Sequence, residues 1–372
     1  MISYFSVKNF RSFKDWTHFS LSSDKKYTFN ENAVNNTIIR HAMLYGENSS
    51  GKSNLGLAML DISRHLSQKT RRYPELGITY LNGDSDCELA EFKFQLVIES
   101  RELLYEYGKN HAAEIVYETL TIDEQLVLQW DKRNSNTADI RLLGAESLKR
   151  DLSDNITSLV SYVLHNAALD DSPPNSALLA FVAFVQGMAF LKTMHNVNDY
   201  AGMRPSKEKD FTATIINELG VDKLQTILNQ AGIPVSLGTY DSPDGQRIMQ
   251  KLANTSLDFL SVASSGTFSL MLLAVWLHKM EQGEITFVYI DEFDAFYHHK
   301  LARAMVKRIA ALPGQTVLSS HNTSVMSNNL LRPDCYFELK NGTITPLNEL
   351  SDREIRKAHN LEKMYRAGAF DG

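Results

Sequence analysis

Residues 46 to 53 have the spacing G-x-x-x-x-G-K-[ST], which is that of a phosphate-binding loop. Glycines at both ends let consecutive backbone N–H groups turn toward the β- and γ-phosphates of a nucleotide. Lys52 adds a mobile positive charge, and Ser53 offers a hydroxyl to Mg²⁺. A nucleoside triphosphate is therefore the expected ligand. The predicted binding residues in and after the loop are Gly46, Glu47, Asn48, Ser49, Ser50, Gly51, Lys52, Ser53 and Asn54.

The residues around this loop provide the context that the motif needs. A mostly apolar run at 38–45 is suited to a buried strand that feeds the loop, and the apolar spacing at 54–60 is that of a helix whose N-terminus faces the anion. The alternative is a Gly/Ser turn that binds nothing. The strand before the loop and the helix after it favour the nucleotide site.

Two carboxylates follow a second apolar run, at residues 285–290. In an open α/β sheet, ligands lie at the carboxyl ends of the strands, which is where Asp291 and Glu292 would stand. We expect Asp291 to hold Mg²⁺ through water, together with Ser53, and Glu292 to orient and deprotonate the attacking water. A solvated strand end is the alternative, and the phosphate loop upstream favours the hydrolytic interpretation.

A third run, at residues 315–320, ends at His321. A histidine at the end of a neighbouring strand can reach a γ-phosphate and sense whether its bond has been hydrolysed. Taken alone, such a histidine is more often a packing or capping residue. Its position one strand after Asp291 and Glu292 favours the functional interpretation.

Ser264, Ser265 and Gly266 stand just before an apolar helical run at 270–277. Small hydroxyl residues and a glycine at a helix N-terminus can bind an anion, but the phosphate loop already occupies the phosphates within one subunit. Two copies could close head to tail, so that this segment caps the γ-phosphate of the partner. The alternative is an ordinary helix cap.

The elements that position these residues are indicated by changes of pattern along the chain. Strand-like residues fill 1–45, and alternating segments predict a β-meander at 91–99, 102–107, 114–122, 125–130 and 139–143. Residues 147–252 are mainly helical in pattern, with runs at 156–168, 177–195 and 210–232. We predict an α/β P-loop NTPase fold with a central mostly parallel sheet, an antiparallel β-meander subdomain and an inserted helical lobe. The expected units are 1–146, 147–252 and 253–372.

Composition sets wider bounds. The chain has 372 residues, of which 43% are hydrophobic and 22% charged, values typical of a globular protein. A net charge of −6 disfavours a surface coated throughout for nucleic acid, although a local basic groove is compatible with it. Cys87 and Cys335 provide no disulfide framework or metal cluster. With no secretory pattern and no apolar stretch long enough for a bilayer, we expect a cytoplasmic protein without membrane contact.

Together the motifs resemble the RecF/SMC-like branch of the ABC-type ATPases, and within it the OLD-related ATPases of phage-defence operons such as abortive-infection, Septu and PARIS systems. The resemblance covers 1–130 and 255–372 and is weak across the helical middle. Residues 361–370 also resemble the tail of stand-alone members. The segments that carry it are Asn9 to Phe13, the phosphate loop, Ser264 to Thr267, Ile290 to Asp294 and Ser319 to His321.

The resemblance implies a role for each matching residue. ATP and Mg²⁺ would be the cofactors, Glu292 the catalytic base, and His321 the switch histidine, with Lys52 on the phosphates. Ser265 and Gly266 would act across a homodimer. Asn9 and Arg11 would approach the nucleotide from the first strand, and Asp294 would lie in the loop that links the two sites.

The chain also departs from the family pattern. The full Leu-Ser-Gly-Gly-Gln signature is missing, and Gln95 is only a weak candidate for the glutamine that senses the γ-phosphate. The central block is too short for the long coiled coil of SMC proteins. Full-length OLD proteins continue into a Toprim nuclease, whereas this chain stops soon after its last nucleotide motif. We therefore expect any nuclease or toxin activity to reside in a separately encoded effector.

The leading hypothesis is an ATP-hydrolysing switch that dimerises around Mg-ATP and controls such an effector in anti-phage defence. The alternative is a RecF-like repair protein that clamps DNA in an ATP-dependent manner. A transporter ATPase subunit and an integral nuclease built on Asp291, Glu292 and Asp294 are disfavoured. Whether GTP is accepted stays open. The phosphate contacts of the DNA clamp would come from Lys69, Arg71 and Arg72, or from Arg204, Lys207 and Lys209.

Overall fold

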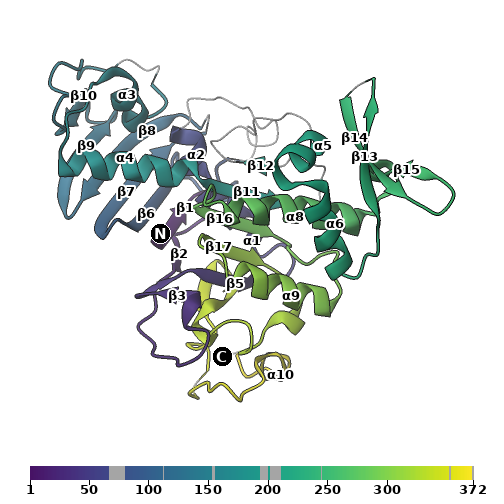
Figure 1. Ribbon diagram of the computed structural model, residues 1–372. Helices are drawn as coiled ribbons and strands as arrows, with labels where there is room; N and C mark the ends of the chain where they lie inside the picture. Colours follow the sequence, from purple (N-terminus) through teal and green to yellow (C-terminus); the bar gives the residue numbers. More distant parts are fainter. Residues whose placement is uncertain are drawn as a thin grey trace.

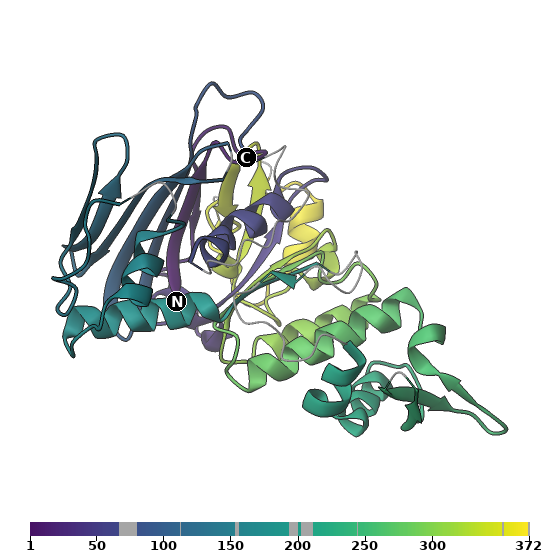
Figure 2. The same ribbon diagram turned by 90° about the horizontal axis from the view of Figure 1, so that it is seen from above.

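Two seven-stranded sheets organise the chain in the computed structural model (Figure 1). The structure describes residues 1–66, 80–111, 113–152, 156–192, 200–201, 211–243, 245–351 and 353–370. Both views place the antiparallel sheet and a small three-stranded sheet at opposite ends of the molecule, with the central sheet between them (Figures 1 and 2). No helix in these described ranges is both long and apolar enough to cross a lipid bilayer.

The central sheet is mostly parallel, as predicted. Its inner strands β11, β16, β17, β5 and β18 run parallel to one another, and β12 and β19 pair antiparallel at its two edges. Every residue of β5, β16 and β17 is buried, which explains why these strands read as continuous apolar runs. In order across the sheet, the strands are β12 (Tyr200–Ala201), β11 (Met188–Lys192), β16 (Phe287–Asp291), β17 (Gln315–Ser319), β5 (His41–Tyr45), β18 (Tyr336–Lys340) and β19 (Thr343–Pro346).

The second sheet is antiparallel throughout and confirms the predicted meander. Its strands alternate buried and partly buried side chains, since one face packs on the core. The last strand differs from the prediction of 139–143: it begins earlier, at Ser135, because it pairs with the preceding strand on both sides of a register shift. The order is β10 (Ser135–Ile140), β9 (Gln125–Asp131), β8 (Ile115–Ile122), β7 (Arg101–Lys109), β6 (Ala90–Ile98), β1 (Ile2–Lys8) and β2 (Thr17–Ser20).

Helices flank both sheets. Three of them, α2, α3 and α4, lie on one face of the antiparallel sheet (Figures 1 and 2). Short elements complete the fold: strands β3 (Val34–Asn35) and β4 (Ile38–Ile39), 3₁₀ turns η1 (Glu31–Ala33), η3 (Thr323–Val325) and η4 (Pro333–Cys335), and the π-helical turn η2 (Ile215–Leu219). The helices are α1 (Lys52–Met59), α2 (Asp61–Leu66), α3 (Leu159–Asn166), α4 (Pro173–Gln186), α5 (Phe211–Thr214), α6 (Val221–Gln230), α7 (Phe259–Val262), α8 (Ser265–Glu281), α9 (His299–Ile309) and α10 (Leu361–Arg366).

Part of the helical prediction for the middle of the chain is wrong. The run at 177–195 is helical only as far as Gln186, and the residues from Met188 onward form β11 of the central sheet. A short, mostly apolar segment has no periodicity that distinguishes a buried strand from a buried helix. Residues near 237–258 are likewise strands, β13 (Leu237–Ser242), β14 (Gly245–Lys251) and β15 (Ser256–Asp258). The division of the chain at 146 and 252 stays a prediction.

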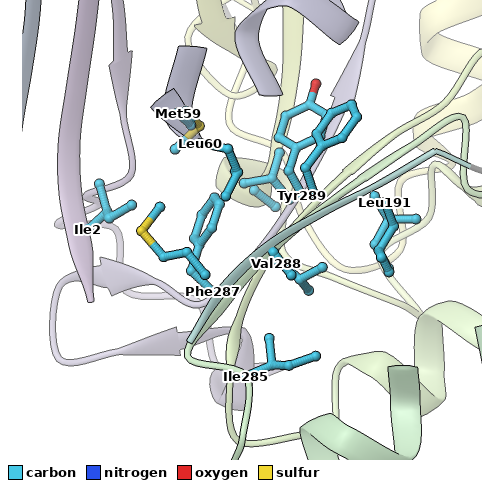
Figure 3. Packing of buried hydrophobic residues seen from close by; sticks show 14 of the residues in the cluster. Ile2, Met59, Leu60, Leu191, Ile285, Phe287, Val288 and Tyr289 are labelled. Atoms are coloured by element: carbon cyan, nitrogen blue, oxygen red, sulfur yellow. The ribbon is translucent and has the colours of Figure 1, made fainter. Parts of the chain in front are cut away.

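A cluster of buried hydrophobic side chains joins four elements. Side chains from β1, the end of α1, β11 and β16 pack together there (Figure 3). Gly56 lets α1 lie directly on the sheet, because a Cβ atom at this position would stand 2.6 Å from the rings of Phe190 and Tyr289. The labelled members of the cluster are Ile2, Met59, Leu60, Leu191, Ile285, Phe287, Val288 and Tyr289.

Candidate functional site

The loop at 46–51 connects the end of β5 to the start of α1, as the motif predicts. Gly51 immediately precedes the helix with a φ of 108°, a conformation that side chains rarely adopt, and a Cβ atom there would lie 2.9 Å from the Ser12 hydroxyl. Ser49 also has a positive φ, of 63°. The backbone of the loop therefore turns sharply into the N-terminus of α1, where an anion is favoured.

Lys52 is buried at the mouth of this loop, with 5% of its surface exposed. Its Nζ donates to the carbonyl oxygens of Gly46 and Glu47, both at 2.9 Å. An ammonium has three donors, so one remains for a phosphate oxygen. Burial lowers the pKa of Lys52, while the carboxylates of Asp291 and Glu292 act in the opposite direction. Lys52 is therefore close enough to both carboxylates for their charges to act on it.

Asp291 is fully buried at the end of β16 and faces the first turn of α1. The Ser53 hydroxyl donates to its Oδ2 at 2.6 Å, and the Ser319 hydroxyl donates to its Oδ1 at 2.6 Å. A hydroxyl and a carboxylate oxygen side by side fit Mg²⁺, which prefers oxygen ligands and is held by few protein groups when phosphates supply the others. The two residues predicted to bind the metal thus lie together.

Glu292 follows in a left-handed conformation, with a φ of 50°. Its backbone N–H donates to the Ser319 Oγ at 2.9 Å, so one hydroxyl connects the backbone of Glu292 with the carboxylate of Asp291. Sequence reasoning gave Ser319 no role of its own. The signal that could have found it is the pair of serines directly before His321. Tyr289 was also missed; its hydroxyl donates to the Lys52 carbonyl at 2.6 Å.

His321 follows β17, the strand beside β16, and it is exposed. Burial of part of the ring lowers its pKa below the usual 6.5, and the Lys52 charge adds to this effect, while Glu292 and Asp291 oppose it. The imidazole is therefore mainly neutral at pH 7. The charges that act on His321 are those of Lys52, Glu292 and Asp291, which are all predicted site residues. The structure therefore brings the predicted histidine to the same edge of the sheet.

Asn9 and Arg11 adopt positive φ angles just after β1. Arg11 lies beside the loop helix, because its Nη1 donates to Asn54 Oδ1 at 3.3 Å. Asn9 is buried, and its amide donates to the carbonyls of Cys87 and Leu89 at 2.6 and 3.0 Å. In this structure Asn9 therefore braces a neighbouring loop, and its approach to a nucleotide stays a prediction.

The segment predicted to act across a dimer is at the start of α8. Ser264 caps the helix by accepting the Thr267 N–H at 3.2 Å, and both Ser264 and Ser265 are exposed. Across the described ranges, no hydrogen bond or ion pair joins 264–266 to the phosphate loop of the same chain. Ser264 thus caps the helix while the N-terminus of the helix stays exposed. An ordinary helix cap and a contact with the γ-phosphate of a partner subunit are therefore compatible.

Two other predicted residues have different surroundings. Asp294 is buried, and the Ser320 hydroxyl lies 2.8 and 3.0 Å from its two carboxylate oxygens; burial raises the pKa of this carboxyl. Gln95 is within β6 of the antiparallel sheet, paired with Leu104, and does not end a strand of the central sheet. The basic residues considered for DNA lie outside the described residues: Lys69, Arg71, Arg72, Arg204, Lys207 and Lys209.

Comparison with known proteins finds one family model. The family described as "AAA domain, putative AbiEii toxin, Type IV TA system" matches residues 42–327, which span the phosphate loop, both carboxylates and His321. No curated protein matches the chain.

Solved structures of SMC head domains are also similar. An SMC head bound to the C-winged helix domain of ScpA is 13% identical with a TM-score of 0.48, over 92% of this chain and 96% of that one. The head domain from Thermotoga maritima is 15% identical with a TM-score of 0.44, over 93% and 98%. A head with an extended coiled coil, bound to the C-terminal domain of ScpA derived from Pyrococcus furiosus, is 13% identical with a TM-score of 0.48, over 92% and 95%.

Proposed function

The chain belongs to the AAA-domain family described with AbiEii toxins of type IV toxin–antitoxin systems, and we propose that it hydrolyses ATP and acts as a nucleotide-dependent switch. The observation that carries the proposal is the contact between Ser53 Oγ and Asp291 Oδ2, at 2.6 Å. It joins the phosphate loop to the carboxylate strand at the point where a metal-bound triphosphate would be held.

Each residue of the site has a chemical role in this proposal. Lys52 would donate its remaining N–H to the phosphates, and Ser53 and Asp291 would hold Mg²⁺, which would neutralise phosphate charge. Glu292 accepts a proton from the attacking water and orients it. His321, neutral at pH 7, donates a hydrogen bond to the γ-phosphate. No side chain has to form a covalent intermediate, because positioning and charge carry most of phosphoryl transfer.

The switch requires two copies of the chain. Ser264, Ser265 and Gly266 are at an exposed helix N-terminus, which we propose contacts the γ-phosphate bound to the partner subunit. ATP held between subunits would stabilise only the closed arrangement, and hydrolysis would release it. The family description supports a toxin–antitoxin or phage-defence setting, in which the closed or open form would hold or release a separately encoded nuclease or toxin.

The test uses two variants of the full chain with Mg-ATP. Lys52→Ala removes the phosphate-binding ammonium, so we expect ATP affinity to fall at least about tenfold. Glu292→Gln removes the base but keeps the shape, so we expect turnover to fall by about 100-fold or more while ATP still binds. Light scattering of the Glu292→Gln protein with ATP should show twice the mass of a single chain.

The matched control for the second variant is Glu349→Gln, a conservative change remote from the site in sequence. It should leave both turnover and mass unchanged. Absence of Mg-ATP binding by the unmodified protein, or full turnover by both site variants, would contradict the ATPase proposal. A Glu292→Gln protein that binds ATP but keeps the mass of one chain would contradict only the dimeric switch.

A further inference from the structure

A second cation approaches the buried carboxylate of the site from a strand that the phosphate loop does not use. Lys192 is the last residue of β11, and the parallel pairing of β11 with β16 places it level with Asp291. Its Nζ lies 3.9 Å from Asp291 Oδ2, the same oxygen that accepts the Ser53 hydroxyl. Lys192 is therefore directed at the point where the two predicted metal-binding residues meet.

The order of the sheet places this lysine opposite the other polar groups. β11 and β17 flank β16 on its two sides, so Lys192 and His321 approach Asp291 from opposite directions. Lys52 comes from α1, and two of its donors are already engaged by the loop carbonyls. The distance of 3.9 Å between Lys192 Nζ and Asp291 Oδ2 is longer than a hydrogen bond, and 28% of the lysine side chain is exposed. The ammonium is therefore held loosely.

The charges of the site leave this ammonium without a fixed partner once a nucleotide binds. Asp291 and Glu292 supply two negative charges, and Lys52 and Lys192 supply two positive ones. Binding of a nucleotide together with its metal ion commits the Asp291 oxygen to the metal, and a divalent cation repels a neighbouring ammonium. Lys192 must then turn on its flexible four-carbon stem toward other negative charge.

We propose that Lys192 binds the terminal phosphate and gives the site its preference for a nucleoside triphosphate over a diphosphate. This proposal rests on the proposed ATPase function and names a specificity residue for it. In the state seen here, Lys192 neutralises Asp291; with Mg-ATP bound, it pairs with the γ-phosphate, which ADP lacks. A lysine that served only to neutralise Asp291 would affect both nucleotides equally.

The experiment measures the equilibrium Kd of Mg-ATP and Mg-ADP for the full chain, by competition against a fluorescent nucleotide. Lys192→Met should weaken ATP binding by about tenfold and ADP binding by less than about twofold, because only the contact to the γ-phosphate is lost. Lys192→Arg keeps the charge and should retain most of the preference for ATP. The matched control is Lys223→Met, which removes a lysine paired with Glu281 at 2.8 Å on the surface of α6 and α8.

Circular dichroism checks that each variant folds, and Lys192→Gln replaces Lys192→Met if the latter does not fold. Equal losses for ATP and ADP, or no loss for either, would overturn the role of Lys192 while leaving the ATPase proposal intact. An unmodified protein that binds neither nucleotide would overturn both. A selective loss of ATP binding in Lys192→Met, with Lys223→Met unchanged, supports the assignment.

Discussion

Ser319 contacts both of the adjacent acidic residues of the site. Its hydroxyl donates to Asp291 Oδ1 at 2.6 Å and accepts the Glu292 N–H at 2.9 Å, and the serine itself is fully buried. Buried polar groups that lose a partner are costly, so the hydroxyl fixes both the rotamer of Asp291 and the backbone turn at Glu292. A predicted metal ligand and a predicted base therefore depend on a residue that contacts neither nucleotide nor water in the proposed reaction.

We predict that Ser319→Ala lowers ATP turnover by about 10- to 100-fold through misplacement of Glu292, while the Kd for ATP changes by less than about threefold. The free energy of unfolding should fall by about 1 to 3 kcal/mol, because a buried acceptor and a buried donor lose their partner. Steady-state hydrolysis and urea unfolding measure the two effects. Ser176→Ala, at an exposed position on α4, should change neither quantity. Unchanged turnover in Ser319→Ala would show that Glu292 is positioned by other contacts.

At the scale of elements, β5 determines where the phosphate loop begins. All five of its residues are buried. The first of them, His41, is titratable and has 2% of its surface exposed. His41 Nδ1 lies 3.0 Å from the Thr316 hydroxyl of β17, a contact that links the loop strand with the strand that precedes His321. Burial lowers the pKa of His41 to about 3, and the neighbouring Arg40 acts in the same direction. The imidazole of the folded chain is therefore neutral at pH 7.

The pH dependence follows from this shift. The unfolded chain takes up a proton at His41 below its ordinary pKa of 6.5, whereas the folded chain does so only near 3. The contribution of His41 to the free energy of unfolding is therefore fully present above pH 6.5. It falls by about 1.4 kcal/mol per pH unit as the pH drops toward 3. The side chain in His41→Gln can still form a hydrogen bond with Thr316 but does not titrate. Between pH 6.5 and 5, the free energy of unfolding in urea should therefore fall by about 2 kcal/mol less for His41→Gln than for the unmodified chain. The exposed control His111→Gln should behave like the unmodified chain; identical slopes in all three would contradict the prediction.

At the scale of the whole molecule, buried polar contacts join parts that lie far apart in the sequence. Gln315 of β17 accepts the Ile2 N–H and donates to the Ile2 carbonyl, each at 2.8 Å, so the central and antiparallel sheets are joined at one side chain. Asp61 of α2 pairs with Lys109 of β7 at 2.6 Å, with 3% and 6% of their side chains exposed. Burial alone would raise the pKa of Asp61, but the Lys109 ammonium outweighs this and holds the pKa below its ordinary value. The second helix after the phosphate loop, α2, is thus tied to the antiparallel sheet.

We predict that Lys109→Met destabilises the chain by about 3 to 5 kcal/mol, because it leaves Asp61 buried without its counter-charge. Denaturant unfolding at pH 7 measures this. The control is Lys93→Met, which removes the more exposed pair between Lys93 and Glu106, 3.0 Å apart, and should cost less than about 1 kcal/mol. Equal costs for the two variants would show that the buried pair has no special role in joining α2 to the sheet.

Much of the fold and the site was predictable because the relevant patterns are local. The loop spacing at 46–53 predicted the place of the loop between a strand and a helix, and the alternating segments predicted the meander with small errors at the ends. Asp291, Glu292 and His321 were found because parallel strands end at one edge of a sheet, so position along the chain translates into proximity. The segment that became β11 was not predictable, since a short buried run carries no period.

The sequence by itself therefore determined the residues of the candidate site: a phosphate loop, two carboxylates, a histidine and the order in which a P-loop fold presents them. Only the tertiary structure decided which further residues meet them. Ser319 and Lys192 lie beside Asp291 because β17 and β11 flank β16, and strand order in a parallel sheet is set by packing between segments that are far apart in the sequence, which no local spacing encodes.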